Sequence, residues 1–230
     1  MVDALATLSR LRASDGYERV VRDFGCVWFL LLATIVTWGI CARLKTLRSA
    51  DLILSDIADL VSSLCVISIY VSLAWFILQR PAPIARAKGI LPSITALVGT
   101  YLPWSFMLLA VDRGPRSPNP LSLAFLVTGA AGAVVIISYL GKSFSIVPQA
   151  RRLVREGPYS VVRHPLYLAE ELALLSCLLR FFSPVTLALF LVHGALQIAR
   201  MIFEENLLRS AFPDYDEYAR STSRLIPHVW

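Results

Sequence analysis

The chain has 230 residues, of which 57% are hydrophobic and 17% are charged, and its mean hydropathy is +0.65. A water-soluble domain carries about a quarter charged residues, so this composition excludes an ordinary soluble globular protein. The net charge of +6 comes from basic residues in short segments between apolar runs. This placement favours the anionic face of a membrane over nucleic acid as a partner.

Six apolar runs follow one another, each near the length of about 20 residues with which a helix crosses a bilayer. Only Ser183 and Pro184 separate the last two runs, which are therefore expected to form a helical hairpin. The sequence predicts an all-α, polytopic transmembrane bundle of about six spans. The six runs cover residues 24–42, 60–78, 90–111, 121–140, 166–182 and 185–203.

The distribution of basic residues predicts how the chain is oriented. With six spans and both termini in the cytoplasm, 16 of the 22 Lys and Arg residues fall on the cytoplasmic side. Such an excess is typical of cytoplasmic loops. We expect an inner-membrane protein, of bacterial type, with its longest polar loop and its C-terminal tail in the cytoplasm. The six basic residues on the other side are Arg43, Lys45, Arg48, Arg113, Arg116 and Arg180.

Polar chemistry is concentrated near the C-terminus. Residues 1–140 carry mainly hydrophobic anchoring signals and are predicted to form an N-terminal unit of four spans. Residues 141–230 are predicted to form the catalytic region, with two spans and a cytoplasmic tail. The four cysteines stand singly in apolar runs, so no metal site is expected.

The first polar motif lies just before the fifth apolar run. Gly157 and Pro158 predict a turn, and Pro165 suits the first position of a helix. His164 and Pro165 therefore open the fifth helix, whose positive end could hold a carboxylate or phosphate. The alternative is an interfacial belt of Arg, His and Tyr without catalytic function.

The second motif ends the sixth run. Arg200 and Glu204 are four residues apart and share one helix face near the cytoplasmic boundary. Glu204 could accept hydrogen bonds from ribose hydroxyls or an amino group, and Arg200 could bind an anionic substrate. A simple surface salt bridge between the two is the alternative. The aromatic tail at 212–218 and 224–227 could close over a pocket.

Together, RHPxY at 163–167, RxxxEE at 200–205 and the YxxY tail resemble the isoprenylcysteine carboxyl methyltransferase family and its phospholipid N-methyltransferase relatives. The resemblance covers about 90 of the 230 residues. It implies a membrane methyltransferase that uses S-adenosyl-L-methionine in a cytoplasm-facing pocket on the hairpin. A lipophilic acceptor would enter from the surrounding lipid, and neither nucleic acid nor metal would take part.

The resemblance also implies roles for individual residues. Arg200 is expected to bind the carboxylate of the acceptor, and Arg200 and His164 are the expected catalytic residues. The expected cofactor contacts are Arg151, Arg152, Leu153, Val154, Tyr159, His164, Pro165, Leu166, Tyr167 and Glu204.

Three other functions stay open from the sequence. A phospholipid (ethanolamine) N-methyltransferase has a similar pocket but receives an amine. A sterol-type reductase has a similar C-terminal pattern and uses NADPH, whose 2′-phosphate Arg151 and Arg152 could bind. The third is a membrane scaffold without catalytic activity. The preferred hypothesis is carboxylate methylation, for which a positioned acceptor and a dry site suffice.

Overall fold

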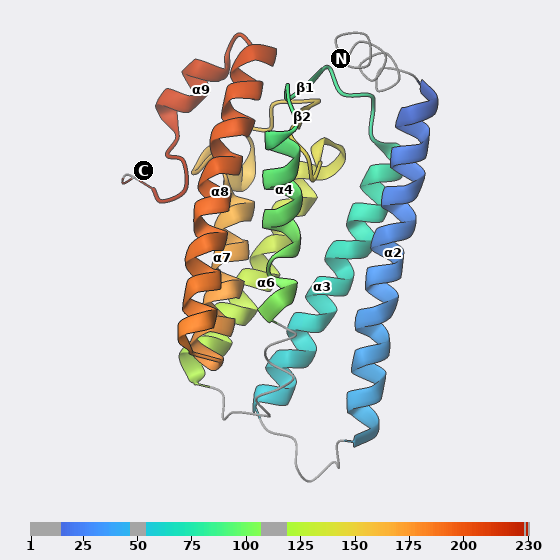
Figure 1. Ribbon diagram of the computed structural model, residues 1–230, viewed down its shortest axis with the longest axis vertical. Helices are drawn as coiled ribbons and strands as arrows, with labels where there is room; N and C mark the ends of the chain where they lie inside the picture. The colour runs from blue at the N-terminus through green and yellow to red at the C-terminus, as the bar shows by residue number, and fades with distance from the viewer. Residues whose placement is uncertain (1–14, 47–53, 107–118, 228, 230) are drawn as a thin grey trace.

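The computed structural model describes residues 15–46, 54–106, 119–227 and 229, and long helices standing side by side dominate it (Figure 1). The predicted all-α class is confirmed, although two strands of two residues each were not predicted. The elements are α2 (Asp15–Thr46), α3 (Leu54–Gln79), β1 (Ala85–Arg86), α4 (Leu91–Tyr101), α6 (Pro120–Leu140), the 3₁₀ turn η1 (Gly141–Ser143), β2 (Gln149–Ala150), the 3₁₀ turn η2 (Gly157–Ser160), α7 (Pro165–Arg180), α8 (Pro184–Ala211) and α9 (Tyr215–Ser221).

In the described part of the chain, four helices are long and apolar enough to cross a membrane. Their apolar segments correspond to the first, second, fourth and sixth predicted runs. Large apolar side chains such as Trp38 and Trp75 are exposed on their outer faces, as expected for side chains that face lipid. The four segments are Arg19–Lys45, Asp59–Gln79, Pro120–Ser143 and Pro184–Ala211.

The third and fifth predicted runs form shorter helices. Helix α4 has 11 residues and α7 has 16, fewer than the about 20 that a spanning helix needs. The end of the third run, at 107–111, lies outside the described residues. Helix length therefore supports four spans in the described part of the chain, and the count of six stays a prediction.

Strand β1 connects two loops that are far apart in the sequence. It pairs antiparallel with β2, with Ala85 opposite Ala150 and Arg86 opposite Gln149. Because both strands lie at one end of the bundle, the chain between them must leave that end and return (Figure 1). Helix α6 runs back to this end of the bundle and leads into the loop that precedes α7.

Ion pairs mark the opposite end of the bundle. Asp59 of α3 accepts hydrogen bonds from Arg43 of α2 at 2.9 Å and from Arg180 of α7 at 2.8 Å. Helix α7 thus begins beside the β strands and ends where α2 ends and α3 begins. Its 16 residues give it a length of about 24 Å at 1.5 Å per residue, half that of the 32-residue α2.

Local signals in the sequence explain where the helices begin. Pro120, Pro165 and Pro184 each occupy the first turn of a helix, where the missing N–H costs nothing. The Ser183 hydroxyl accepts from the Thr186 N–H at 3.1 Å, completing a capping box. The predicted start of the fifth helix at Pro165 and the predicted hairpin of α7 and α8 are both confirmed.

Helices α6 and α7 pack closely at a glycine. A Cβ atom on Gly129 would lie 2.7 Å from the backbone nitrogen of Ala173 and 2.8 Å from the carbonyl oxygen of Ala169. Only glycine allows this approach, which is typical of small residues between membrane helices. Ala133 and Ile136, on the same helix α6, pack with Tyr159.

Candidate active site

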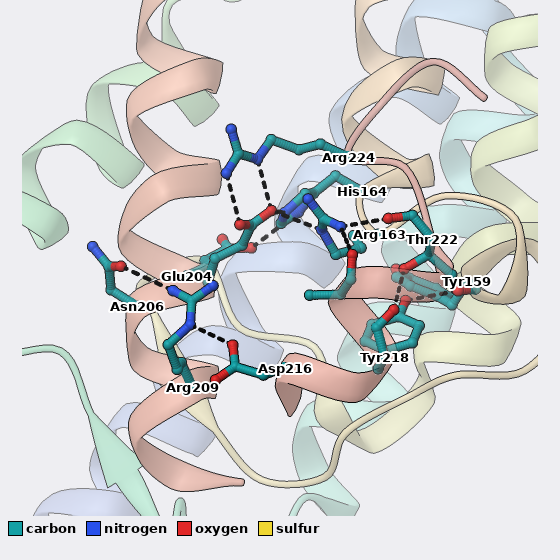
Figure 2. Close-up of polar contacts among 12 residues, drawn as sticks. Tyr159, Arg163, His164, Glu204, Asn206, Arg209, Asp216, Tyr218, Thr222 and Arg224 are labelled. Atoms are coloured by element: carbon teal, nitrogen blue, oxygen red, sulfur yellow. Dashed lines mark hydrogen bonds and ion pairs between the residues drawn. The ribbon is translucent and has the colours of Figure 1, made fainter. Parts of the chain in front are cut away.

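Glu205, near the end of α8, is buried and surrounded by three basic side chains. Arg224 donates to both of its carboxylate oxygens, from Nε at 2.8 Å and from Nη2 at 2.9 Å. Arg163 Nε donates at 3.0 Å, and His164 Nε2 lies 3.2 Å away (Figure 2). An ionised carboxylate only accepts hydrogen bonds, so His164 carries a proton on Nε2. The bonds to Glu205 raise the pKa of Arg224, although partial burial opposes this.

This cluster connects three separate segments of the chain. The backbone N–H of Arg163 donates to the carbonyl of Ser223 at 2.8 Å, and that of His164 donates to the carbonyl of Arg224 at 3.0 Å. The loop before α7 is therefore held between α8 and the C-terminal tail. As a result, the His164 ring has a fixed position at the start of α7.

The side chain of Glu204 has different surroundings from that of Glu205. It is 25% exposed, and one oxygen accepts a hydrogen bond from the Tyr167 hydroxyl. The other oxygen lies 3.8 Å from His164 Nδ1. The rings of His164 and Tyr167 are stacked, with centroids 5.5 Å apart. A carboxylate has about four lone-pair sites, so Glu204 retains acceptor capacity for a bound molecule.

Two adjoining cavities of about 110 Å³ each meet at these residues. The loop-side cavity extends to the β2 segment and the tail, where Gln149, Arg152, Tyr215 and Tyr218 contribute to its lining. The helix-side cavity extends between α4, α7 and α8. The residues that line both cavities are Leu140, Ser145, Tyr159, His164 and Glu204.

Arg200 is the buried cation of the helix-side cavity. It is 5% exposed, its Nη1 donates to Gln197 Oε1 at 2.8 Å, and its guanidinium lies 4.7 Å from the centre of the Tyr167 ring. Glu170 Oε2 lies 3.9 Å from the same Nη1. The Nε of Arg200 is buried and has no hydrogen-bond partner in the described part of the chain. A buried donor of this kind is costly unless a bound group accepts from it.

The tail closes the loop-side cavity. The Tyr218 hydroxyl donates to the carbonyl oxygen of Tyr159 at 2.7 Å (Figure 2). Burial raises the pKa of Tyr218 to about 12, so this donor stays protonated at neutral pH. Tyr215, on the same short helix α9, is fully buried beside it. The aromatic tail therefore covers one wall of the cavity.

Most of the predicted cofactor residues meet at these cavities. Glu204, His164 and Tyr159 line both cavities, and Arg200 lines the helix-side cavity. Arg151 and Pro165 line neither, and the side chain of Arg151 instead bonds to the segment that follows α3. Of the remaining predicted residues, Arg152, Leu153 and Val154 line the loop-side cavity, and Leu166 and Tyr167 line the helix-side cavity.

No role was predicted for Glu205, Arg163 or Arg224. Arg163 and Arg224 are 42 and 19 residues from Glu205. No spacing rule joins such positions. Arg163 and Glu205 belong to the RHPxY and RxxxEE motifs and Arg224 to the tail, but these motifs gave no sign that the three side chains meet. A charged side chain near the end of an apolar run costs free energy unless it has a partner.

Comparison with known proteins gives a family match in this half of the chain. Residues 121–215 match the phospholipid methyltransferase family. This confirms the predicted resemblance to the group of isoprenylcysteine and phospholipid methyltransferases. The matched region begins in α6 and includes the residues that line both cavities.

Two curated bacterial proteins are similar to parts of the chain. The cobalt-zinc-cadmium resistance protein CzcN of Cupriavidus metallidurans is 40% identical over 78 residues, which are 34% of this chain and 36% of that protein. The nickel-cobalt-cadmium resistance protein NccN of Alcaligenes xylosoxydans xylosoxydans is 31% identical over 133 residues, 54% of this chain and 61% of that protein. The chain thus matches less than two thirds of the length of either relative. No solved structure matches the chain.

Proposed function

We propose that this chain, whose residues 121–215 match the phospholipid methyltransferase family, is an integral membrane methyltransferase that uses S-adenosyl-L-methionine. The acceptor is a lipophilic molecule that reaches the site from the bilayer, and its methylated group is a carboxylate. The family match supports methyl transfer, and the four long apolar helices support a membrane location.

The loop-side cavity offers suitable groups for the cofactor. S-adenosyl-L-methionine supplies a methyl group that is already activated on a positively charged sulfur. Glu204 has acceptor capacity for its ribose hydroxyls or amino group. Arg152, at the exposed edge of this cavity, can pair with its carboxylate. The aromatic rings of Tyr159 and Tyr218 provide flat apolar surfaces for a nucleobase.

The proposal that the acceptor is a carboxylate rests on Arg200. The single observation behind this choice is that Arg200 lines a cavity next to the cofactor residues while its buried Nε has no partner among the described residues. A guanidinium binds a carboxylate through paired hydrogen bonds. The stacked position over Tyr167 holds the guanidinium in one orientation.

The residues of the site mainly bind, orient and exclude water. A carboxylate acceptor is ionised at neutral pH, so no residue has to remove a proton from it. Arg200 orients the acceptor oxygen, and Glu204 with His164 and Tyr167 fixes the opposite side of the site. The gain in rate comes from alignment and from the dry surroundings between α7, α8 and the tail.

Methylation of a phospholipid amine is the second candidate. Glu170 favours it, because its 40% exposed carboxylate lies in the same cavity as Arg200. A carboxylate there could accept a hydrogen bond or a proton from an amine headgroup. Arg200 would then serve mainly to hold Glu170 and Gln197.

Calorimetric titration of the purified protein tests the cofactor assignment. Saturable binding of S-adenosyl-L-methionine, with no comparable binding of NADPH, is expected from the cavity and the family match. The Glu204→Gln variant should bind more weakly, and Arg209→Gln, an exposed position one turn further along α8, should bind normally. Binding of NADPH but not of S-adenosyl-L-methionine would make the protein a reductase instead.

A further inference from the structure

Arg151 lies next to the cavities but lines neither of them. It is 8% exposed, and its Nε donates to the carbonyl oxygen of Pro81 at 2.9 Å. Its Nη2 donates to Gln149 Oε1 at 2.6 Å. The remaining nitrogen, Nη1, is buried without a hydrogen-bond partner among the described residues. The side chain is thus fixed in place with one unused donor.

Arg80 contributes a second donor at the same place. It directly precedes Pro81, the residue whose carbonyl holds Arg151. Its Nε is also buried without a partner in the described part of the chain. Burial, together with the positive charges of Arg80 and Arg86, lowers the pKa of Arg151 to about 10. The buried Arg151 and the half-buried Arg80 therefore lie within electrostatic reach of each other.

Among the described residues, no acidic side chain balances the charges of Arg80 and Arg151. Within residues 15–46, 54–106 and 119–227, no carboxylate forms an ion pair with Arg80 or Arg151. Like charges repel, and each unused buried donor costs free energy. Both costs disappear if an anion with several acceptor oxygens binds between the two side chains. A phosphate group has such oxygens and suits guanidinium donors.

The location points to the membrane surface. The spanning segment of α3 ends at Gln79, one residue before Arg80. Arg151 follows β2, which pairs with β1 at that end of the bundle (Figure 1). Lipid phosphates lie at this depth, where a helix leaves the hydrocarbon core.

We propose that Arg80 and Arg151 form a binding site for a phosphate group at the membrane surface. Its source is either the headgroup of an anionic phospholipid or free phosphate. The phosphate group binds between the end of α3 and the β1–β2 pair, and a lipid headgroup bound there fastens the loop-side wall to the bilayer. Neither arginine lines the cavities, so this inference does not rest on methyl transfer.

Ligand-dependent thermal unfolding of the purified full chain in detergent tests this site. The probes are dihexanoyl-phosphatidylglycerol and inorganic phosphate, each compared with chloride at equal ionic strength. A ligand that binds only the folded state raises the unfolding temperature, and the concentration dependence gives its affinity. The variants are Arg80→Gln, Arg151→Gln and, as a control with the same charge change, the exposed Arg220→Gln on α9.

Arg80→Gln is the decisive variant, because no hydrogen bond from its side chain to the described residues is lost. Loss of a charge-assisted bond should weaken binding about tenfold or more. Arg151→Gln should weaken it at least as much, and Arg220→Gln should not. Stabilisation by the lipid alone identifies a headgroup site, and equal stabilisation by phosphate identifies a general phosphate site. Absence of stabilisation by both probes, or an unchanged affinity in Arg80→Gln, would overturn the proposal.

Discussion

Successive residues of a helix point about 100° apart, so Glu204 and Glu205 face different surroundings on α8. Glu205 points toward three basic side chains from distant segments, and Glu204 points toward the cavities. At this scale one carboxylate holds the site together, while its neighbour is available to a ligand.

Replacing each glutamate separately tests this division. Glu205→Gln leaves Arg163 and Arg224 without their buried counter-charge, and removal of one partner of a buried ion pair costs about 3–5 kcal/mol. Its unfolding temperature in detergent should fall sharply. Glu204→Gln is the matched control, because it changes the same chemical group at a partly exposed position. Equal stability of the two variants would contradict the structural role of Glu205.

Arg200 and Glu204 should also have separable effects on binding and turnover. They have different hydrogen-bond partners, and no ion pair joins them in the described part of the chain. Glu204→Gln should raise the dissociation constant of S-adenosyl-L-methionine about ten- to a hundredfold, through loss of a charge-assisted bond. Arg200→Ala should leave that constant near the wild-type value but abolish turnover of a carboxylate acceptor.

Calorimetry on both variants, together with a turnover assay, measures these two effects. Equal losses of cofactor affinity would show that the two side chains act as one unit. Survival of turnover with an amine phospholipid in Arg200→Ala would favour the second candidate function.

At the scale of elements, the starts of helices were predictable and their lengths were less so. The Pro residues and the two-residue link at 183–184 are local signals, and the structure follows them. Hydropathy alone could not show that α4 stops at Tyr101 or that α7 has only 16 residues. The two strands were not predictable either, because two residues carry no alternating pattern. Their pairing also joins loops far apart in the sequence, since Ala85 and Ala150 are 65 residues apart and Arg86 and Gln149 are 63 apart.

The contact between α6 and α7 gives a prediction at this scale. Gly129→Ala would place a methyl group against the backbone of α7, which cannot move without shifting the whole helix. Its unfolding temperature should fall, with a cost of about 1–3 kcal/mol for an overpacked contact. Gly132→Ala is the matched control, because its Cβ would meet only the Ala169 Cβ at 3.9 Å. Equal stability of the two variants would mean that α6 and α7 do not pack at Gly129.

At the scale of the whole molecule, the cavities and the Asp59 ion pairs lie at opposite ends of the bundle. Arg43 and Arg180, both expected on the side away from the cytoplasm, meet at Asp59. Residues 85–86 and 149–150, both expected in the cytoplasm, meet in the β1–β2 pair. The charge distribution in the sequence and the contacts in the structure thus agree on which segments share a side.

Reporter fusions test this orientation in cells. A reporter at Arg116 should face away from the cytoplasm, and one at the C-terminus should face the cytoplasm. The reason is that this topology places 16 basic residues on the cytoplasmic side and six on the other side. Identical locations for both reporters would reject the six-span topology.

The site itself was predictable only where residues are close in sequence or fit the family motif. His164, Tyr167, Arg200 and Glu204 line one cavity, and their roles stay predictions. The binding partners of Arg151 were not foreseeable, since they depend on the approach of the α3–β1 loop from 70 residues away. The positions of the tail and of α4 depend on the tertiary fold in the same way.

Transfer of a labelled methyl group is the most direct test of the proposed function. The purified protein, reconstituted with lipid extract from its own membrane, is incubated with S-adenosyl-L-methionine that carries a radioactive methyl group. Carboxylate methylation predicts label in the organic-extractable fraction, released as methanol by mild base as expected for a carboxyl methyl ester, and lost in Glu204→Gln and Arg200→Ala. Base-stable label would indicate amine methylation. Organic-extractable label no higher in the wild type than in Glu204→Gln would contradict methyl transfer at this site.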